Sequence, residues 1–229
     1  MMTATRVQLS ETESFLYHVT HDLKAHTRAL REIPTWLAED LAASNVALPD
    51  DVVEHLSRLS SASAGLDRML DALTELSRVG RLADPPDAHS VAHLAQDVWN
   101  SVPGVAAARL NIDGDAIVRG PENDFRRLLS ALFRNAVQHN TAEEPSVRVA
   151  IFPRDNRVDI SISDNGPGIE PRFRQRVFEA LQTLQPKSAT GSAGIGLTVA
   201  RKVVSQHGGQ IGIADTASGC RVDFDLPKA

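Results

Sequence analysis

Leucines that recur every seven residues near the start of the chain constrain its fold more than any other feature. They are joined by Val19 and Ile33 at companion positions, with His26 between them. An apolar stripe with this spacing predicts an amphipathic helix over about residues 11–41. Pro34 lies inside this helix, at a position expected to face outward. The leucines of the stripe are Leu16, Leu23, Leu30 and Leu37.

A second apolar stripe follows a break in the pattern. Asp50 can cap a second helix that fades near Gly80. Two such helices form a hairpin whose narrow stripe is best buried against a second copy, which predicts a four-helix bundle in a homodimer. The alternative is that the stripe packs on the rest of the chain. The second stripe consists of Leu56, Leu59, Leu66, Leu70 and Leu73.

The run Asp84-Pro85-Pro86 ends the helical pattern and predicts a domain boundary, with a dimerisation domain at 1–84 and a second domain at 85–229. Periodicity in the second domain mixes short strands with helices, and few crossover connections are plausible. This order predicts an α+β sandwich. The expected helices cover about 89–102, 121–139 and 194–206. The expected strands cover 110–112 and 116–119 around an Asp-Gly turn, a hairpin at 147–152 and 158–163, and a hairpin at 211–214 and 221–226.

Composition argues against several classes of partner. The chain has 229 residues, a net charge of −5 and 42% hydrophobic residues, which suits two modest globular domains. It contains no basic run that predicts a nucleic-acid or anionic-membrane partner, and no apolar run near the roughly 18 residues that span a bilayer. Cys220 has no second cysteine to pair with, so a reducing, cytoplasmic location is expected.

His21 and Asp22 are the first pair of chemical interest. In the heptad frame His21 falls at the position farthest from the stripe, so it is expected to face solvent. A neutral imidazole is a good nucleophile, and the Asp22 carboxylate can accept its N–H proton as the ring becomes positive. Taken alone, such a pair is more often a solvated surface pair. His26 falls within the stripe, so a core or interface position is expected for it.

Three clusters in the second half contain residue types suited to nucleotide chemistry. In RNAVQHN, Asn135 offers an amide oxygen of the kind that Mg2+ accepts beside phosphate oxygens and water. In DNGPG, Asp164 follows a strand and can accept a hydrogen bond from an exocyclic amine. In GSAGIGL, glycines precede a helix whose N–H groups can bind phosphate, and Lys187 upstream can add charge. Each cluster alone is also typical of an ordinary helix, turn or loop.

Taken in this order, the clusters resemble the boxes of the histidine kinase family over about residues 15–226. HDLKAHTRAL is similar to the H-box, LLSALFRNAVQHN to the N-box, DNGPGI to the G1 box, VFEALQTLQP to the F-box and GSAGIGL to the G2 box. The wording of the H- and F-boxes is closest to phytochrome-type kinases. The resemblance implies a dimerisation and phosphotransfer domain followed by an ATP-binding domain with the fold of gyrase-type ATPases.

The resemblance also implies a role for each matching residue. His21 would accept the γ-phosphoryl group of ATP with Asp22 as general base, and Asn135 would hold Mg2+. Asp164 would bind the adenine amine, beside an ATP lid at about 179–193. The phosphoryl group would then pass to an aspartate of a response-regulator receiver domain. The remaining nucleotide-site positions are Gly166, Gly168, Phe178, Lys187, Gly194, Gly196 and Leu197.

The sequence departs from the family pattern at several positions. Ala25 stands where Thr or Asn accompanies phosphatase activity, so weak dephosphorylation of the partner is expected. His26 replaces a proline, which alters the expected local bend. Nucleotide affinity and lid mobility are expected to differ because of three further departures. These are Ala131 for a common Asn, Gln138-His139 for a common Lys-Tyr, and Ser192 for a common Gly.

Three alternatives remain beside a histidine kinase. A gyrase- or MutL-like ATPase needs a Glu four residues before Asn135, where Ala131 stands. A degenerate phosphotransfer protein would keep His21 but lose ATP, although Asp164 and Asn135 are retained. An anti-sigma-type serine kinase would share the ATP boxes without needing the His-Asp hairpin. About 20 residues before His21 are too few for a sensor, so the chain is expected to be a fragment or to take its signal from a partner.

Overall fold

The computed structural model describes residues 2–44, 47–80, 84–180, 182 and 194–229. The chain divides into two compact units, here called the helical unit, which ends at Ser77, and the sheet unit, which begins at Arg78. The boundary expected after residue 84 stays a prediction, since residues 81–83 lie outside the described part.

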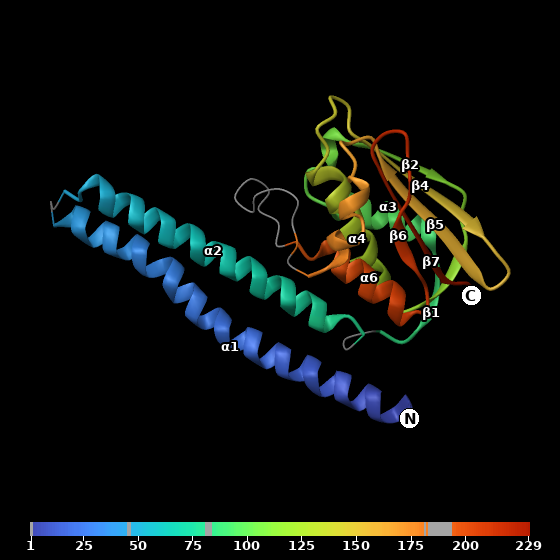
Figure 1. The fold of residues 1–229 in the computed structure, drawn as a ribbon, viewed down its shortest axis with the longest axis horizontal. Coiled ribbons are helices and arrows are strands. Elements are labelled where there is room, and N and C mark those ends of the chain that lie inside the picture. The colour runs from blue at the N-terminus through green and yellow to red at the C-terminus, as the bar shows by residue number, and fades with distance from the viewer. Residues whose placement is uncertain (1, 45–46, 81–83, 181, 183–193) are drawn as a thin grey trace. The chain divides into compact units, whose positions relative to one another are not determined.

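The helical unit is a hairpin of two long helices, as the heptad pattern predicts. Helix α1 spans Met2–Ala43 and helix α2 spans Asp50–Arg78, and they run side by side in opposite directions (Figure 1). Asp50 and Asp51 lie in the first turn of α2, where negative charge is favourable to the helix dipole. Among the described residues, no helix combines the length and the apolar character needed to cross a bilayer.

Polar side chains, rather than the leucine stripe, connect α1 to α2. The Thr27 hydroxyl donates to the Asp67 carboxylate, Arg31 lies 3.3 Å from the same carboxylate, and Lys24 Nζ lies 2.7 Å from Asp71. Thr27 is buried, and so is Pro34 seven residues later, so the expectation of an outward proline is wrong. The face of α1 that meets α2 therefore consists of small and polar side chains.

The leucine stripe remains exposed in the single chain. On α1 the exposed fraction is 43% for Leu23, 45% for Leu30 and 51% for Ile33. On α2 it is 44% for Leu59 and 41% for Leu66. Apolar side chains at these positions gain little from the hairpin itself, because burial must remove them from water to stabilise the fold. Further exposed apolar residues of the same unit are Val19, Trp36, Leu37 and Val53.

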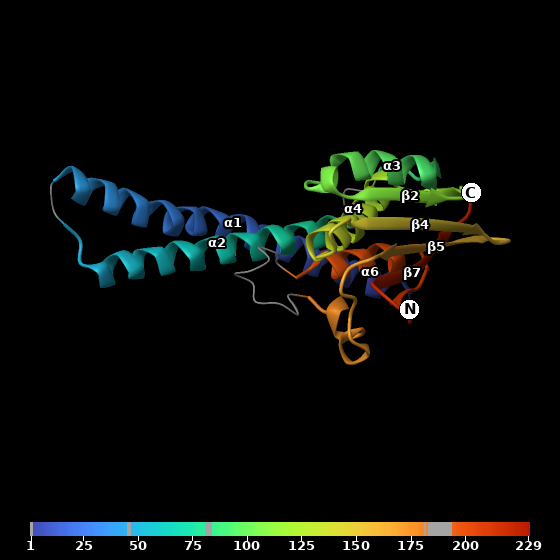
Figure 2. The same ribbon diagram turned by 90° about the horizontal axis from the view of Figure 1, so that it is seen from above.

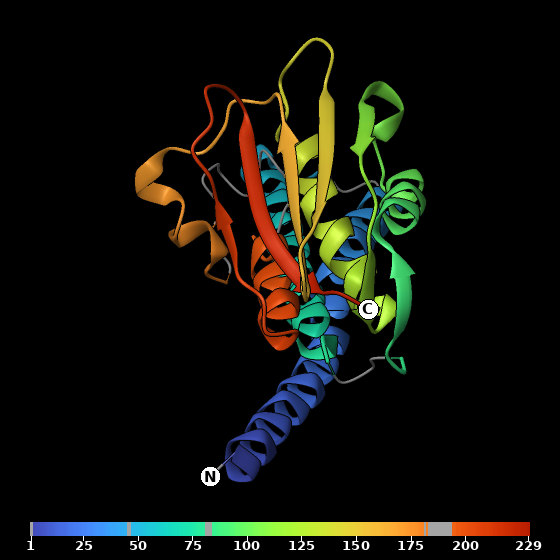
Figure 3. The same cartoon turned by 90° about the vertical axis from the view of Figure 1, so that its right-hand side faces the viewer.

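A five-stranded sheet of order β2-β4-β5-β7-β6 forms the centre of the sheet unit (Figure 3). The β4-β5 and β6-β7 pairs are antiparallel hairpins, as predicted, and β5 pairs with β7. Strand β2 joins the edge in parallel with β4. The strands are β2 Arg109–Asp113, β4 Ser146–Pro153, β5 Arg157–Asp164, β6 Ile211–Ile213 and β7 Cys220–Pro227.

The segments around the Asp-Gly turn do not pair with each other. Strand β3, Ile117–Gly120, instead pairs antiparallel with β1, Asp87–Ser90, in a separate two-stranded sheet. The Asp115 carboxylate accepts hydrogen bonds from the Ser90 hydroxyl and the Ala92 N–H, and so joins the segment before β3 to the start of α3. The helix expected at 89–102 accordingly starts later: α3 spans Val91–Ser101, capped by Ser90.

Helices α3, α4 (Glu122–Gln138) and α6 (Gly196–Gln206) cover one face of the five-stranded sheet, and Figure 2 shows α4 and α6 on the same side of it. Alternate residues of β4, β5 and β7 are buried, as expected for strands with one covered face. Short 3-10 turns complete the unit at Val105–Ala107, Pro171–Phe173 and Arg176–Phe178. The predicted α+β sandwich is confirmed.

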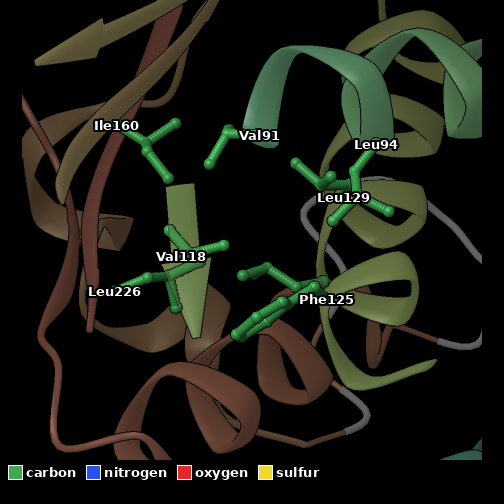
Figure 4. Close-up of a pocket in the computed structure, with 8 residues that line it drawn as sticks. Val91, Leu94, Val118, Phe125, Leu129, Ile160 and Leu226 are labelled. Atoms are coloured by element: carbon green, nitrogen blue, oxygen red, sulfur yellow. The ribbon is translucent and has the colours of Figure 1, made fainter. Parts of the chain in front are cut away.

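A small apolar cavity lies in the core between β3, α3, α4 and the sheet (Figure 4). Its volume is about 10 Å3, near the minimum for one water molecule, and its lining offers no polar partner. The cavity is therefore a packing defect rather than a binding site. Its lining residues are Val91, Leu94, Val118, Phe125, Leu128, Leu129, Ile160 and Leu226.

Truncating Leu128 tests the importance of this core. Leu128 has no exposed surface, so Leu128→Ala should lower the free energy of unfolding by about 2–5 kcal/mol. Ile117→Ala is the control, because Ile117 is 43% exposed and should cost below about 1 kcal/mol. Urea unfolding is followed by the fluorescence of buried Trp99 in a Trp36→Phe background. Equal losses for the two variants would contradict this assignment of the core.

Candidate functional site

Asp164, the last residue of β5, is held by two backbone groups. Its Oδ1 accepts a hydrogen bond from the Gly166 N–H at 2.9 Å and from the Cys220 N–H at 3.3 Å. Cys220 reaches it because β5 and β7 pair with Asp164 opposite Cys220. Among the described residues no hydrogen bond is made to Oδ2, so this oxygen can still accept one. The carboxylate is therefore fixed in orientation with one oxygen able to accept a donor from a ligand.

The environment of Asp164 favours its protonated form more than water does. Burial, the largest effect, raises the pKa of the carboxyl above its ordinary value. The N–H groups of Gly166 and Cys220 and the charge of His139 oppose this shift. A half-buried carboxyl with a perturbed pKa, placed at a strand end, is typical of a functional site.

Two glycines let the DNGPG loop lie against the start of β7. Gly168 has φ of +75°, and a Cβ there would lie 2.5 Å from the Gly219 carbonyl oxygen. Gly219 has φ of +72°, and a Cβ there would overlap the Asp164 backbone carbonyl. A side chain is thus excluded at both of these glycines. The backbone of the loop at Gly166 and Gly168 lies beside Asp164, which suits a flat ligand.

Asn135 and Gly196 come together through the packing of α4 on α6. Asn135 is half-buried on α4, one turn after Ala131. A Cβ on Gly196 would lie 3.6 Å from the Ala131 carbonyl oxygen, so the start of α6 approaches α4 closely. Leu197 is buried at this approach. The N-box and G2-box positions are therefore neighbours in the structure.

Phe178 packs within the sheet unit, and its expected place beneath the ATP lid stays a prediction. Its side chain is buried, and the Arg201 guanidinium of α6 lies 5.9 Å from its ring centroid. Gly194 adopts φ of +69°, just before α6. Lys187 and most of the expected lid at 179–193 lie outside the described residues.

The residues expected to accept the phosphoryl group, His21 with Asp22 beside it, lie on α1. His21 belongs to this helix, and its side chain is outside what the structure describes. Asp22 is exposed, as are Ala25 and Arg28, which follow His21 by one and two helical turns. His26, expected in a core or an interface, is exposed in the single chain.

Sequence reasoning missed several residues that surround Asp164. Cys220 is buried beside it, and burial, followed by the Asp164 charge, raises the pKa of its thiol to about 12. Asn140 and Asn165 form an amide pair next to Gly166. Asn140 ends the RNAVQHN motif and Asn165 lies in DNGPG. In a single sequence, however, the tendency of asparagine to form turns accounts for both residues equally well.

A protein-family model described as histidine kinase-, DNA gyrase B-, and HSP90-like ATPase matches residues 120–229. This segment is an ATPase domain of that family. FilI, a methanogenesis regulatory histidine kinase of Methanothrix harundinacea, is 27% identical over 95% of this chain and 25% of its own length. Cyanobacterial phytochrome B of Nostoc sp. is 26% identical over 90% of this chain and 28% of its own length. The chain thus has a histidine kinase catalytic core, and it spans about a quarter of the length of these relatives.

Solved structures support the same fold. Full-length ShkA in complex with AMPPNP aligns with a TM-score of 0.64 and 21% identity, over 94% of this chain and 46% of that one. The histidine kinase ThkA in complex with the response regulator protein TrrA aligns with a TM-score of 0.64 and 16% identity, over 100% of this chain and 66% of that one. These alignments confirm a helical region followed by an α/β ATPase domain.

The pKa of Asp164 predicts how pH acts on the sheet unit. The pKa of Asp164 is raised in the folded state, so protonation of its carboxyl favours folding. This contribution to stability is fully present below the ordinary Asp pKa of about 4 and is lost as the pH rises through the folded pKa. Asp164→Asn keeps an acceptor for the Gly166 and Cys220 N–H groups but does not titrate. The stability of the wild type relative to this variant should therefore fall with rising pH and then level off. Urea unfolding of both proteins between pH 4 and 8 measures this relative stability. If the wild type instead became more stable relative to Asp164→Asn as the pH rises, burial would not be the dominant effect on the pKa.

Proposed function

We propose that this chain is the catalytic core of a two-component histidine kinase, which binds Mg-ATP, phosphorylates its own His21 and passes the phosphoryl group to an aspartate of a response regulator. The observation that carries the proposal is Asp164, with one oxygen fixed by two backbone N–H groups and the other able to accept, beside a loop that contains Gly166 and Gly168. Because ATP is the donor, the cytoplasm is the proposed location.

The proposed nucleotide site uses groups that the sheet unit already brings together. Asp164 would accept the adenine amine, and the loop at Gly166 and Gly168 would pass under the base. Among the described residues no cluster of His, Cys, Asp or Glu holds a metal by itself. Asn135 would therefore bind Mg2+ together with phosphate oxygens and water, which are ligands that this ion prefers. The start of α6 at Gly196 would face the phosphates.

The proposed phosphoryl transfer is an in-line displacement. A ring nitrogen of His21 attacks the γ-phosphorus, a P–N bond forms, and the P–O bond to the leaving ADP breaks. The proton on the other ring nitrogen is shared with or passed to Asp22, which offsets the positive charge that develops on the ring. The exposed face at Ala25 and Arg28 favours an acceptor that two different protein sites can reach.

Ala131 favours a kinase over an ATP hydrolase. An alanine methyl group cannot take a proton from water. No general base for hydrolysis is therefore supplied at this position of α4. Histidine, rather than water, is the proposed acceptor.

Radiolabelled ATP tests the kinase proposal directly. With γ-labelled ATP and Mg2+, the wild type should acquire acid-labile, base-stable label, and His21→Gln should acquire none. His26→Gln is the matched control, since His26 is an exposed histidine of the same helix, and it should label like the wild type. Asp22→Asn should label about 100-fold more slowly or worse, because a general base typically contributes about that much.

Each other outcome of this labelling has a definite meaning. Label that persists in His21→Gln would show that His21 is not the acceptor. Absence of label on the wild type, together with absence of ATP binding, would favour a phosphotransfer protein with a degenerate kinase domain. The departures at Ala131 and Gln138-His139 give that second candidate its specific support.

The exposed leucine stripe supports a homodimer. Leu23, Leu30 and Ile33 are between 43% and 51% exposed, while other side chains of α1, among them Thr27 and Lys24, already contact α2. Two copies of the hairpin would bury these side chains in a four-helix bundle. The proposed partners are thus a second copy and a receiver domain, with the input signal supplied by another domain or protein.

Sedimentation velocity tests the dimer. The wild type should sediment as a dimer at micromolar concentration, and Leu30→Glu should dissociate at least about tenfold more readily, because an unpaired charge would enter the interface. Thr35→Glu adds the same charge at an exposed position of α1 outside the stripe and should leave the dimer intact. A wild-type monomer, or equal weakening by both variants, would refute the proposed interface.

A further inference from the structure

Two asparagine side chains connect the end of α4 to the loop after β5. Asn140 Nδ2 donates to Asn165 Oδ1 at 2.8 Å. Asn140 follows α4, the helix that contains Asn135, and Asn165 directly follows Asp164. This amide pair therefore joins the two segments that bear the proposed metal and adenine positions.

Backbone partners fix the orientation of both amides. Asn165 Oδ1 also accepts from the Ser146 N–H at 2.9 Å, and Asn165 Nδ2 donates to the Glu144 carbonyl at 2.9 Å. Asn140 Oδ1 accepts from the Ala142 N–H at 2.9 Å. These backbone partners show which atom of each amide is the oxygen and which is the nitrogen. In the contact between the two side chains, a donor therefore meets an acceptor. A flipped amide on either side would set two like groups against each other.

The pair also lies against the backbone of the ligand loop. A Cβ on Gly166 would lie 3.4 Å from the Asn140 Cα and 3.5 Å from its Cγ. Gly166 in turn donates its N–H to Asp164 Oδ1. Asn140 therefore lies beside Gly166, whose N–H helps to orient the Asp164 carboxylate. A displacement of Asn140 can move Gly166 and, through it, Asp164.

We propose that Asn140 and Asn165 are positioning residues, whose amide pair holds the DNGPG loop against the end of α4 and so sets Asp164 relative to Asn135. This inference rests on the proposed ATP site. If it is right, loss of the pair weakens nucleotide binding and also reduces the preference for adenine. Guanine presents a carbonyl where adenine presents an amine, and a displaced carboxylate discriminates less between them.

Asn140→Asp separates the amide pair from the turn. The aspartate keeps an oxygen for the Ala142 N–H but has no donor for Asn165 Oδ1, and it also adds a negative charge. The neutral variant Asn140→Ser, measured alongside, removes the same donor without adding charge. We expect Mg-ATP to bind about 3- to 10-fold more weakly by calorimetric titration, as for the loss of one hydrogen bond. The preference for ATP over GTP should fall as well. Asn111→Asp makes the same chemical change at an exposed position of β2 and should bind like the wild type.

A double variant measures whether the two asparagines act together. If they form one device, Asn140→Ala combined with Asn165→Ala should cost no more in ATP affinity than the more harmful single change. Asn140→Ser is the second variant if Asn140→Asp fails to fold, since its hydroxyl can still accept from the Ala142 N–H. Circular dichroism checks that each variant is folded at the titration temperature.

The outcomes separate this inference from the function on which it rests. If the wild type does not bind Mg-ATP, the proposed function is wrong and the inference falls with it. If the wild type binds but folded Asn140→Asp binds within twofold with an unchanged ATP preference, the inference is wrong and the function stands. Weaker binding with unchanged ATP preference would also overturn it, since the carboxylate would not have moved.

Discussion

The pairing of β5 with β7 is the constraint on which the rest of the sheet unit depends. Its register sets Cys220 opposite Asp164 and thereby brings a backbone N–H to the carboxylate. A slip of one residue would turn every side chain of a strand to the other face, exposing the core and moving Asp164 from its donors. The fold and the candidate site are thus specified by the same backbone hydrogen bonds.

Helix α4 serves both the core and the candidate site. Its buried side includes Leu128 and Phe133, and the Phe133 ring packs edge-on against Trp99 of α3. Half-buried Asn135 belongs to the candidate site. The start of α6 lies against α4 at Gly196, where a Cβ would lie 3.6 Å from the Ala131 carbonyl oxygen. Because one rigid helix holds the core and Asn135 together, stable packing also orders the proposed metal ligand.

Features that depend on neighbouring residues could be predicted from the sequence, and features that depend on distant ones could not. The two long helices and the β4-β5 and β6-β7 hairpins follow from periodicity and turns. The parallel pairing of β2 with β4 and the hydrogen bonds of Asp115 to the start of α3 join distant residues, and periodicity contains neither. Asp164 could be singled out from its motif, whereas the Asn140–Asn165 pair joins residues 25 positions apart.

The helical unit has two faces of opposite chemistry, and they respond oppositely to dissolved salt. The contacts of Lys24 with Asp71 and of Arg31 with Asp67 are partly exposed ion pairs, which ions screen over about 8 Å at physiological strength. The leucine stripe carries no charge, and strongly hydrated salts such as sulfate favour its burial. A higher concentration of such a salt therefore weakens the ion pairs between α1 and α2 while it favours burial of the leucine stripe. The strength of the contact at each face of the hairpin can thus change in the opposite direction.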